Sequence, residues 1–300
     1  MGNSDTDLAE SLDLYQSIFL ASRNLAQRSH REYTTDLRDL IDFLEQQAHL
    51  QRPEQVSRHH LESYLAELDR RGLAGSTRRR KVASIRSFFA FLEDQGTIPQ
   101  SPARKLIPPA REYIQPRVLT EGEYKRLLEA VHGEIRDNAI IELLLQTGMR
   151  LSEIARLTTA NIELPTKSSQ DEGNVGSVYI LGKGRKSRTV TLNWKACRAL
   201  RSYLQIRPEV DDNHLFITKF GRGISGRAIE YLVEKYLKQA SIHSASVHTL
   251  RHTFATYMVK KGTKLDVVRQ ALGHQDLKTT SIYVELAREV MDKELQQDAL

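Results

Sequence analysis

Two imidazoles and one guanidinium lie close together in the segment VHTLRHTFATYMVKKG, residues 247–262. His248, Arg251 and His252 interrupt apolar residues that have the spacing of a buried helix. Cationic and proton-exchanging side chains on one helix can hold an anion by charge and by hydrogen bonds. The cluster therefore predicts a site for an anionic group.

Histidines four residues apart can instead bind zinc, as they do in His-Glu-x-x-His helices. Here Thr249, Leu250 and Arg251 stand between the two histidines, so the glutamate is missing and a cation lies between the imidazoles. We therefore expect no metal ion at this site.

Other polar residues of the same half of the chain complete a set that could transfer a phosphoryl group. They are Arg150 and Glu153 in TGMRLSE, Lys183 in GKGRKSR, His274 in LGHQDLKTTSIY and Tyr283 at the end of that segment. Two guanidinium groups can bind the non-bridging oxygens of a phosphate and stabilise a pentacoordinate transition state. A tyrosine can attack phosphorus covalently, and a lysine or histidine can protonate the leaving oxygen.

Each of these residues, taken singly, also has an ordinary interpretation. Arg150 could be an exposed side chain, Lys183 a turn lysine and Tyr283 a core aromatic. The sequence contains neither the acidic cluster of two-metal nucleases nor a Gly-x-x-x-x-Gly-Lys phosphate loop. The combination favours phosphoryl transfer that needs no metal, nucleotide or other cofactor.

The composition narrows the class of protein. The 300 residues carry a net charge of +6, and 40% of them are hydrophobic, which is enough for two packed domains. No stretch approaches the ~18 apolar residues of a membrane span, and the polar, acidic N-terminus is unlike a secretory signal. The single cysteine, Cys197, fits a reducing compartment, so we expect a cytoplasmic protein without a membrane partner.

Basic residues gather in two runs. Seven basic residues and no acidic one lie from Arg70 to Arg86, and four lie from Lys183 to Arg188. Such runs suit the phosphates of nucleic acid, because binding releases condensed counterions. A solvated basic face is the alternative.

Apolar residues at helical spacing predict four helices in the first hundred residues, at 11–26, 29–47, 57–72 and 75–96. Their short connections favour a small bundle. Arg78, Arg79, Arg80 and Lys81 fall in the first turn of the last helix, where the helix dipole disfavours cations. We therefore expect these charges to face something anionic.

Five of the eight prolines lie between residues 99 and 116 and indicate an extended linker. Beyond it, helical patterns recur at 119–131, 138–148, 151–157, 194–206, 224–240, 248–261, 264–272 and 285–297, and strand patterns at 176–181 and 189–192 flank the second basic run. The sequence predicts a mainly α protein with domains at 1–105 and 118–300 and a linker at 106–117. The second domain is expected to be mostly helical with a small antiparallel sheet.

The segments TGMRLSEIARL, GKGRKSRTV, HTLRHTFAT and LGHQDLKTTSIY, in this order behind a helical first domain, resemble the tyrosine recombinase (phage integrase) family. The layout is most similar to its Xer-type members, and the resemblance covers about residues 10–290. It implies a SAM-like core-binding domain followed by a catalytic domain.

The resemblance implies a role for each matching residue. Arg150 and Arg251 would clamp the scissile phosphate, Lys183 would protonate the 5′ leaving oxygen, and His248 would act in proton transfer towards the nucleophile. His274 would hydrogen-bond the phosphate, Tyr283 would form the 3′-phosphotyrosyl link, and Glu153 would orient Arg150 or a neighbouring histidine. His252 is adjacent to the motif and is expected to support or pack against it.

The resemblance also implies the partner and the assembly. The partner would be double-stranded DNA with inverted-repeat core sites, bound at the nucleoid by a homotetramer on two duplexes or by a heterotetramer with a second recombinase. The residues expected to contact DNA are Arg78, Arg79, Arg80, Lys81, Arg86, Arg185, Lys186, Arg188, Arg222 and Arg227. The segment from Arg288 to Leu300 is expected to dock on a neighbouring protomer.

Two other classes of function remain open at this point. A catalytically inactive DNA-binding regulator would need the basic runs but not the tyrosine, and a type IB topoisomerase would use the same chemistry without a specific site. Among recombinases, the roles in replicon dimer resolution and in movement of a mobile element are both open. The long loop at 165–176 leaves room for the second role.

Overall fold

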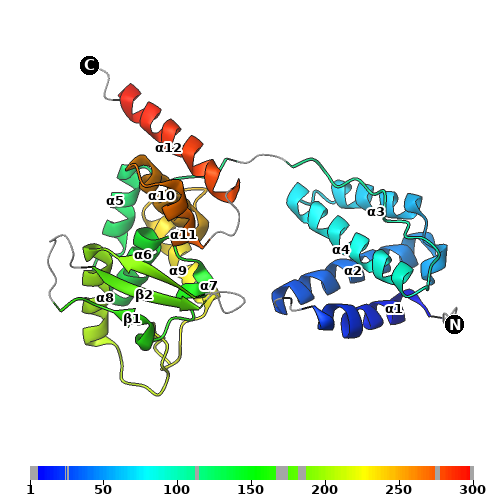
Figure 1. Cartoon of the computed structure of the whole chain (residues 1–300), viewed down its shortest axis with the longest axis horizontal. Coiled ribbons are helices and arrows are strands. Elements are labelled where there is room, and N and C mark those ends of the chain that lie inside the picture. Colours follow the sequence, from blue (N-terminus) through cyan, green and yellow to red (C-terminus); the bar gives the residue numbers. More distant parts are fainter. Residues whose placement is uncertain are drawn as a thin grey trace. The chain divides into compact units, whose positions relative to one another are not determined.

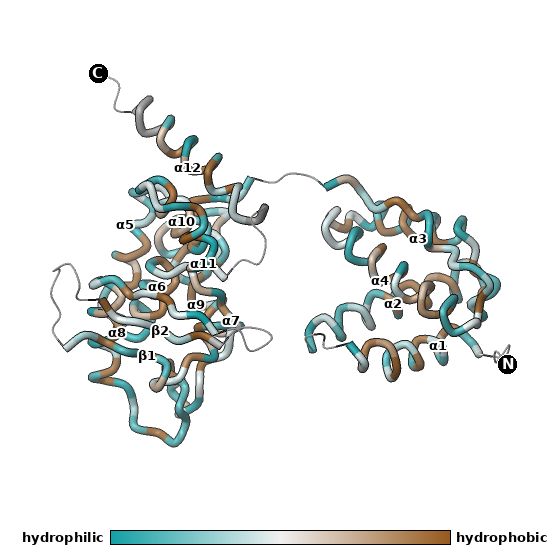
Figure 2. The backbone as a smooth tube through the Cα atoms, viewed as in Figure 1, coloured by the Kyte–Doolittle hydropathy of each residue, from teal (hydrophilic) through white to brown (hydrophobic). Residues whose placement is uncertain are grey.

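The computed structural model describes residues 6–23, 25, 27–111, 115–166, 175–181, 187–273 and 278–297. The chain divides into two compact units, residues 1–114 and 115–300, and the division falls within the proline-containing segment (Figure 1). Each unit has its own hydrophobic core. Figure 2 shows apolar and polar residues alternating along most helices of both units.

The first unit is entirely helical in its described part. It contains α1 (Leu8–Leu14), the π-helix η1 (Tyr15–Leu20), α2 (Gln27–Ala48), the 3-10 turn η2 (Pro53–Gln55), α3 (Arg58–Arg70) and α4 (Gly75–Asp94). On α2 the apolar residues Leu37, Leu40 and Leu44 recur at helical spacing, and all three are fully buried. The predicted bundle is confirmed, with α1 and η1 together forming its first helix.

The second unit surrounds a short sheet with helices. Its helices are α5 (Glu121–Ala130), α6 (Ile135–Thr147), α7 (Leu151–Ile154), α8 (Trp194–Ile206), α9 (Gly226–Gln239), α10 (Val247–Lys260), α11 (Leu265–Leu272) and α12 (Lys278–Gln297), with a 3-10 turn η3 (Thr159–Asn161). Strands β1 (Ile162–Glu163), β2 (Gly176–Leu181) and β3 (Ser187–Leu192) form an antiparallel sheet in the order β1-β2-β3, with Val178 opposite Val190. The mainly helical fold with a small sheet agrees with the prediction.

Helix α6 lies at the centre of this unit. It packs against α8 and α10, and its residues from Ala139 to Leu145 are all buried (Figure 1). A helix buried on every side must be apolar all round, and the sequence AIIELLL satisfies this with Glu142 as the one exception. The C-terminal end of α6 is therefore a fixed point from which nearby side chains can be positioned.

The last helix begins earlier than its sequence indicates. The pattern predicts a helix at 285–297, but α12 starts at Lys278 and carries Tyr283 on its second turn. The β-branched residues Thr279, Thr280 and Ile282 lower helix propensity here, and packing against α10 overrides that preference. None of the helices in the described ranges is both long and apolar enough to cross a membrane.

Candidate active site

Arg251 lies on α10 with its side chain buried and its guanidinium held by backbone carbonyls. Its Nη1 donates to the carbonyl oxygen of Gly148 at 2.5 Å, and its Nη2 donates to that of Leu272 at 2.7 Å. These two carbonyls belong to the C-terminal ends of α6 and α11, where helical oxygens have no helical partner. A guanidinium has five N–H donors, so others remain for a ligand.

The approach of these helices depends on Gly148. This residue ends α6 in the left-handed conformation, with φ +60°. A Cβ at this position would collide with the ring of Phe254 and lie 2.9 Å from Cδ2 of Leu272. Glycine therefore permits both the turn and the close packing that bring the Gly148 carbonyl to Arg251.

Arg150 and Glu153 form the edge of the site immediately after this turn. The Glu153 carboxylate accepts the backbone N–H of Arg150 at 2.8 Å and its Nη1 at 3.2 Å. The Nη2 of Arg150 donates to the carbonyl oxygen of Gly273 at 3.0 Å, and the side chain remains partly exposed. Glu153 thus caps the N-terminus of the short helix α7 and also orients the side chain of Arg150.

A third arginine reaches the same carboxylate from the sheet. Arg188 on β3 donates from Nη1 and Nη2 to the two oxygens of Glu153, at 2.8 and 2.9 Å. Sequence reasoning places Arg188 among the DNA contacts and misses this pairing. No local signal connects the two residues, which are 35 positions apart, although Arg188 is visible as the last basic residue of GKGRKSR, five positions after Lys183.

The cluster holds more positive than negative charge. Burial, with help from the nearby Arg150, lowers the pKa of Arg251 to about 10, whereas Glu153 and Tyr283 act in the opposite direction. Burial opposes ionisation of Glu153, but its hydrogen bonds from Arg188 and Arg150 lower its pKa overall. Three guanidinium groups against one carboxylate leave a site whose empty state is electrostatically unfavourable and which an anion would stabilise.

Tyr283 lies beside these arginines, and its side chain is only 2% exposed. It packs in a small apolar cluster with Ala255, Val268, Leu272 and Leu286. Burial raises the pKa of its hydroxyl, while the charges of Arg251 and Arg150 oppose that rise. The tyrosine is therefore in the field of both arginines but closed to solvent in this structure.

The nearest described base to this tyrosine is His252. Its Nδ1 lies 3.1 Å from the Tyr283 hydroxyl, and burial, with the neighbouring His248 and Arg251, lowers its pKa to about 4. The imidazole is therefore neutral near pH 7 and able to accept a proton. His248, by contrast, is exposed one helical turn away.

The structure thus brings together six of the residues singled out by sequence, with His248 at the margin. They are Arg150, Glu153, Arg188, Arg251, His252 and Tyr283. Four further candidates, Lys183, Arg185, Lys186 and His274, lie outside the described residues. Within the described ranges, no three His, Cys, Asp or Glu side chains are grouped in a way that could hold a metal ion.

The basic run on α4 has an anionic partner within its own unit. Lys81 is 5% exposed, and its Nζ lies 2.7 Å from Oδ2 of Asp39 and 3.4 Å from Oδ1 of Asp36. Arg80 also pairs with Asp36, which is fully buried. The charge that the helix dipole disfavours is therefore neutralised by α2, which leaves Lys81 little surface for DNA, and its contact with DNA stays a prediction.

The remaining predicted DNA contacts of this unit also have internal partners. Arg78 pairs with Asp69, Arg79 donates to the carbonyl of Ala110 at 2.6 Å, and Arg86 donates to that of Leu106. The three side chains differ in solvent exposure: Arg86 is exposed, whereas Arg78 and Arg79 are half-buried. These arginines hold the end of the unit together as well as presenting charge.

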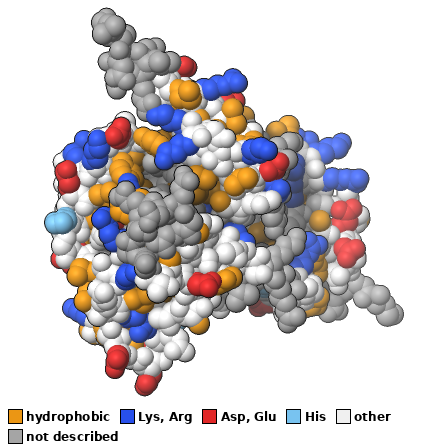
Figure 3. Space-filling model, turned by 60° about the vertical axis from the view of Figure 1, so that its left-hand side comes forward, with side chains coloured by type: hydrophobic (Ala, Val, Ile, Leu, Met, Phe, Trp, Pro, Cys, Tyr) orange, Lys and Arg blue, Asp and Glu red, His pale blue; other side chains and the backbone are white. Residues whose placement is uncertain are grey.

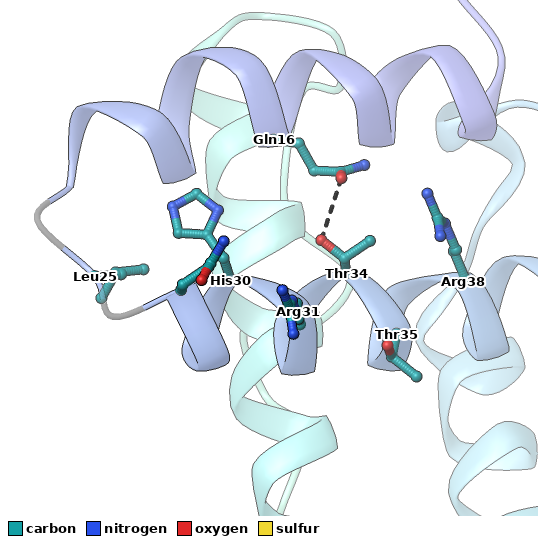
Figure 4. A pocket seen from close by; sticks show the side chains of 8 residues that line it. Gln16, Leu25, His30, Arg31, Thr34, Thr35 and Arg38 are labelled. Atoms are coloured by element: carbon teal, nitrogen blue, oxygen red, sulfur yellow. Dashed lines mark hydrogen bonds between the residues drawn. The ribbon is translucent and has the colours of Figure 1, made fainter. Parts of the chain in front are cut away.

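A polar groove on the first unit was not predicted from sequence. It lies between the α1–η1 segment and α2 (Figure 4), and Thr34 Oγ1 donates to Gln16 Oε1 across it at 3.2 Å. Arg31, Thr35 and Arg38 are exposed along its α2 side. Their spacing of four and three residues, on the face of α2 opposite its buried leucines, is the signal that could have identified them.

Two predicted DNA contacts of the second unit, Arg222 and Arg227, are exposed. Arg222 lies in a turn closed by the Thr218 amide, and Arg227 lies in the first turn of α9. The start of α9 is close to the site, because a Cβ on Gly226 would lie 3.7 Å from Leu151. Figure 3 shows one face of the molecule, over which Lys and Arg side chains are spread with a few acidic ones between them.

Both units match known sequence families. Residues 12–96 match the N-terminal SAM-like domain of phage integrases, and residues 117–289 match the phage integrase family. The chain is 34% identical to tyrosine recombinase XerC of Thermodesulfovibrio yellowstonii over 266 residues, which are 84% of each protein. It is 31% identical to tyrosine recombinase XerD of Halalkalibacterium halodurans over 276 residues, which are 89% of each.

Solved structures share the fold at lower identity. A lambda integrase fragment, solved as a dimer bound to a COC′ core site, aligns with a TM-score of 0.76 at 16% identity, covering 93% of this chain and 95% of that one. XerH recombinase in a post-cleavage complex with palindromic difH aligns with a TM-score of 0.76 at 20% identity, covering 94% and 83%. At these sequence identities, the structural similarity establishes a shared fold.

Proposed function

This chain belongs to the phage integrase family and is a site-specific DNA recombinase, and we propose that it breaks and rejoins DNA through a covalent bond between Tyr283 and a DNA phosphate. The observation that carries the proposal is the convergence of Arg150 and Arg251 beside the Tyr283 hydroxyl. The two guanidinium groups are suited to bind the phosphodiester, and the tyrosine hydroxyl is suited to attack its phosphorus.

In the proposed first step, Arg150 and Arg251 bind the non-bridging oxygens of the scissile phosphate. The Tyr283 oxygen attacks phosphorus, its proton passes to a histidine, and the bond to the 5′ oxygen breaks. Lys183 protonates that leaving oxygen, so the products are a 3′-phosphotyrosyl enzyme and a free 5′-hydroxyl. The excess charge of the arginine cluster would stabilise the additional negative charge of the transition state.

The second step reverses the first with a different strand. A 5′-hydroxyl of the partner duplex attacks the phosphotyrosine, and Tyr283 recovers its proton as the leaving group. One phosphodiester replaces another, so the exchange needs no ATP and no metal in this scheme. Exchange of one strand pair would give a Holliday junction, and exchange of the second pair would resolve it.

The buried state of Tyr283 bears on when this step occurs. Tyr283 is 2% exposed as a residue and its hydroxyl lies next to His252, so it cannot reach a DNA phosphate without displacement of its neighbours. We infer that DNA binding shifts the start of α12. His252 could take the proton in the geometry described, and His248 could do so after a shift.

Two surfaces support DNA binding in this proposal. On the second unit, Arg222 and Arg227 are exposed, and the start of α9, which carries Arg227, packs against α7 beside the arginine cluster. On the first unit, the groove that Arg31, Thr35 and Arg38 border offers two exposed arginines to phosphates. Acting on DNA would place the protein in the cytoplasm, at the nucleoid.

Assembly on two duplexes follows from the proposed reaction, because four strands must be cut. A lambda integrase tetramer bound to a Holliday junction shares the fold, with a TM-score of 0.72 at 17% identity. We propose a tetramer here, built from this chain alone or with a second recombinase. The exposed Met291 near the end of α12 supports a docking role for the residues that follow it.

The test is covalent capture on a suicide duplex that carries a candidate core site and a nick near the scissile phosphate. Wild type should form an adduct that survives a denaturing gel, and Tyr283→Phe should form none while binding the same DNA. Tyr257→Phe, a tyrosine of α10, is the matched control and should retain the adduct. An adduct in Tyr283→Phe would contradict the proposal. Relaxation of supercoiled DNA without a site would favour the topoisomerase function.

A further inference from the structure

The salt bridge between Arg188 and Glu153 is bidentate. Nη1 of Arg188 donates to Oε1 of Glu153 at 2.8 Å and Nη2 donates to Oε2 at 2.9 Å, and both side chains are largely buried. Arg150 makes only a single, longer contact of 3.2 Å with the same carboxylate through its guanidinium. Glu153 is therefore committed to Arg188 more strongly than to Arg150.

The backbone around Arg188 leaves room for this geometry. A Cβ on Gly273 would lie 2.7 Å from Nη1 and 2.9 Å from Cζ of Arg188, so a side chain here would displace the guanidinium from its present position. The carbonyl of the same glycine accepts Nη2 of Arg150. Gly273 thus separates the two arginines and gives Arg150 an uncharged partner.

The consequence concerns the charge that Arg150 can offer to a ligand. An arginine locked in a two-pronged salt bridge with a carboxylate is largely neutralised and loses the donors that face an anion. If Arg188 were absent, Glu153 would be free to form that salt bridge with Arg150, which is already within reach. The carboxylate would then compete with the phosphate for Arg150.

We propose that Arg188 is a positioning residue that engages Glu153 and so keeps the Arg150 guanidinium available for the scissile phosphate. The inference rests on the proposed function, since it assigns Arg188 a task in the same reaction. It differs from the expectation that Arg188 contacts DNA directly. On this view Arg188 acts on the phosphate through Glu153 and Arg150.

A methylphosphonate substrate separates an effect of Arg188 on the scissile phosphate from general structural support. A methyl group in place of one non-bridging oxygen removes a negative charge, so the reaction depends less on the arginines that bind it. Arg188→Ala should slow adduct formation about 10- to 100-fold on the phosphodiester and only about threefold on the methylphosphonate. An equal loss on both substrates would assign Arg188 to general structural support and overturn the proposal.

A second variant tests the competition by Glu153. Glu153→Gln removes the charge that would sequester Arg150, so Arg188→Ala combined with Glu153→Gln should react faster than Arg188→Ala alone. Additive losses in the double variant would contradict the mechanism. If Arg188→Ala does not fold, Arg188→Lys serves instead, since one ammonium cannot engage both oxygens and should give a smaller, substrate-dependent loss.

The control is Arg136→Ala, at the opposite end of α6. Arg136 is also a half-buried arginine with a carboxylate partner, Asp137, so it reports the cost of losing such a pair away from the site. It should react like wild type on both substrates.

The role of Arg188 can also be tested by a binding measurement that does not require recombination. If wild type forms no adduct, the proposed function fails, and titration with orthophosphate, followed by the NMR signals of arginine Nε–H groups, decides the inference alone. Arg188→Ala should then bind orthophosphate more weakly than wild type, and the double variant should recover affinity. Unchanged affinity in Arg188→Ala would overturn it.

Discussion

His252 Nδ1 lies 3.1 Å from the hydroxyl of Tyr283, and this contact joins the middle of α10 to the second turn of α12. The imidazole is neutral at physiological pH because burial and two neighbouring residues, His248 and Arg251, disfavour its charged form. The same contact that holds the tyrosine in place therefore also offers it a proton acceptor. It makes the packing of α12 sensitive to pH.

We predict that the folded chain loses stability as pH falls from about 6.5 to about 4. The folded pKa of His252 is about 4, below its ordinary value of 6.5, so the unfolded chain binds more protons in this window and acid favours unfolding. Thermal unfolding of wild type and His252→Asn across this window measures the effect. The melting temperature of His252→Asn should fall less steeply, whereas His59→Asn, an exposed histidine of α3, should parallel wild type. Parallel slopes for all three proteins would exclude His252 as the source.

Gly148→Ala should destabilise the second unit and reduce phosphate binding together. The new Cβ would collide with Phe254 and would also force a residue other than glycine into the left-handed conformation. We therefore expect the free energy of unfolding to fall by about 2–4 kcal/mol. Gly262→Ala is the matched control, because Gly262 has φ +80° but nothing within 4 Å of a Cβ. It should lose only about 1 kcal/mol. Urea unfolding distinguishes the two, and equal losses would show that the packing at Gly148 is unimportant.

Lys81→Met should destabilise the first unit without weakening DNA binding at fixed salt. Removing Lys81 leaves the buried Asp36 with Arg80 as its one remaining ion-pair partner among the described residues, and we expect the free energy of unfolding to fall by about 2–4 kcal/mol. Arg58→Met, which removes an exposed pair with Glu62, should cost less than about 1 kcal/mol. A DNA affinity that falls for Lys81→Met while the fold remains intact would instead support a direct contact of Lys81 with DNA.

Arg222→Ala and Arg227→Ala should weaken DNA binding mainly through charge. Each lost phosphate contact should reduce the slope of log affinity against log salt by about 0.9. Fluorescence anisotropy with a core-site duplex at several salt concentrations gives the slope. Lys125→Ala, which removes an exposed lysine of α5 paired with Glu121, is the control and should leave the slope unchanged. An unchanged slope in both arginine variants would place the DNA elsewhere.

Deleting residues 291–300 should impair assembly on DNA while leaving the monomer folded. The cut keeps the buried Tyr283, Leu286 and Ala287 and removes Met291, a residue that is 46% exposed. We expect the free energy of unfolding to change by less than about 0.5 kcal/mol. Analytical ultracentrifugation with two-site DNA measures the assembly. Normal synapsis by the truncated chain would refute a docking role for this segment.

Periodicity was sufficient for most of the fold. The bundle, the small sheet and the helices from α5 to α11 follow from apolar spacing, because each helix buries one face, or in α6 every face, against its neighbours. The start of α12 could not be predicted, since Thr279, Thr280 and Ile282 disfavour a helix that only packing stabilises. Local patterns report local preferences, and tertiary contact overrides them at such places.

The site was predictable in its members but not in its connections. Motif resemblance identified Arg150, Arg251 and Tyr283, yet nothing local shows that Arg188 pairs with Glu153 from another element. The internal pairing of the basic run on α4 was missed for the same reason, because the carboxylate that pairs with Lys81 lies more than forty residues earlier. Ion pairs between different helices and strands could not be predicted from the single sequence.

The backbone partners of Arg150 and Arg251 have a consequence for how this site can vary over evolutionary time. Both guanidinium groups rest on carbonyl oxygens, those of Gly148, Leu272 and Gly273, which any amino acid would supply. Drift in the surrounding side chains leaves these supports intact, so lineages are free to diverge around an unchanged pair of arginines. Constraint falls instead on the two glycines, where a left-handed backbone and a crowded Cβ position exclude other residues.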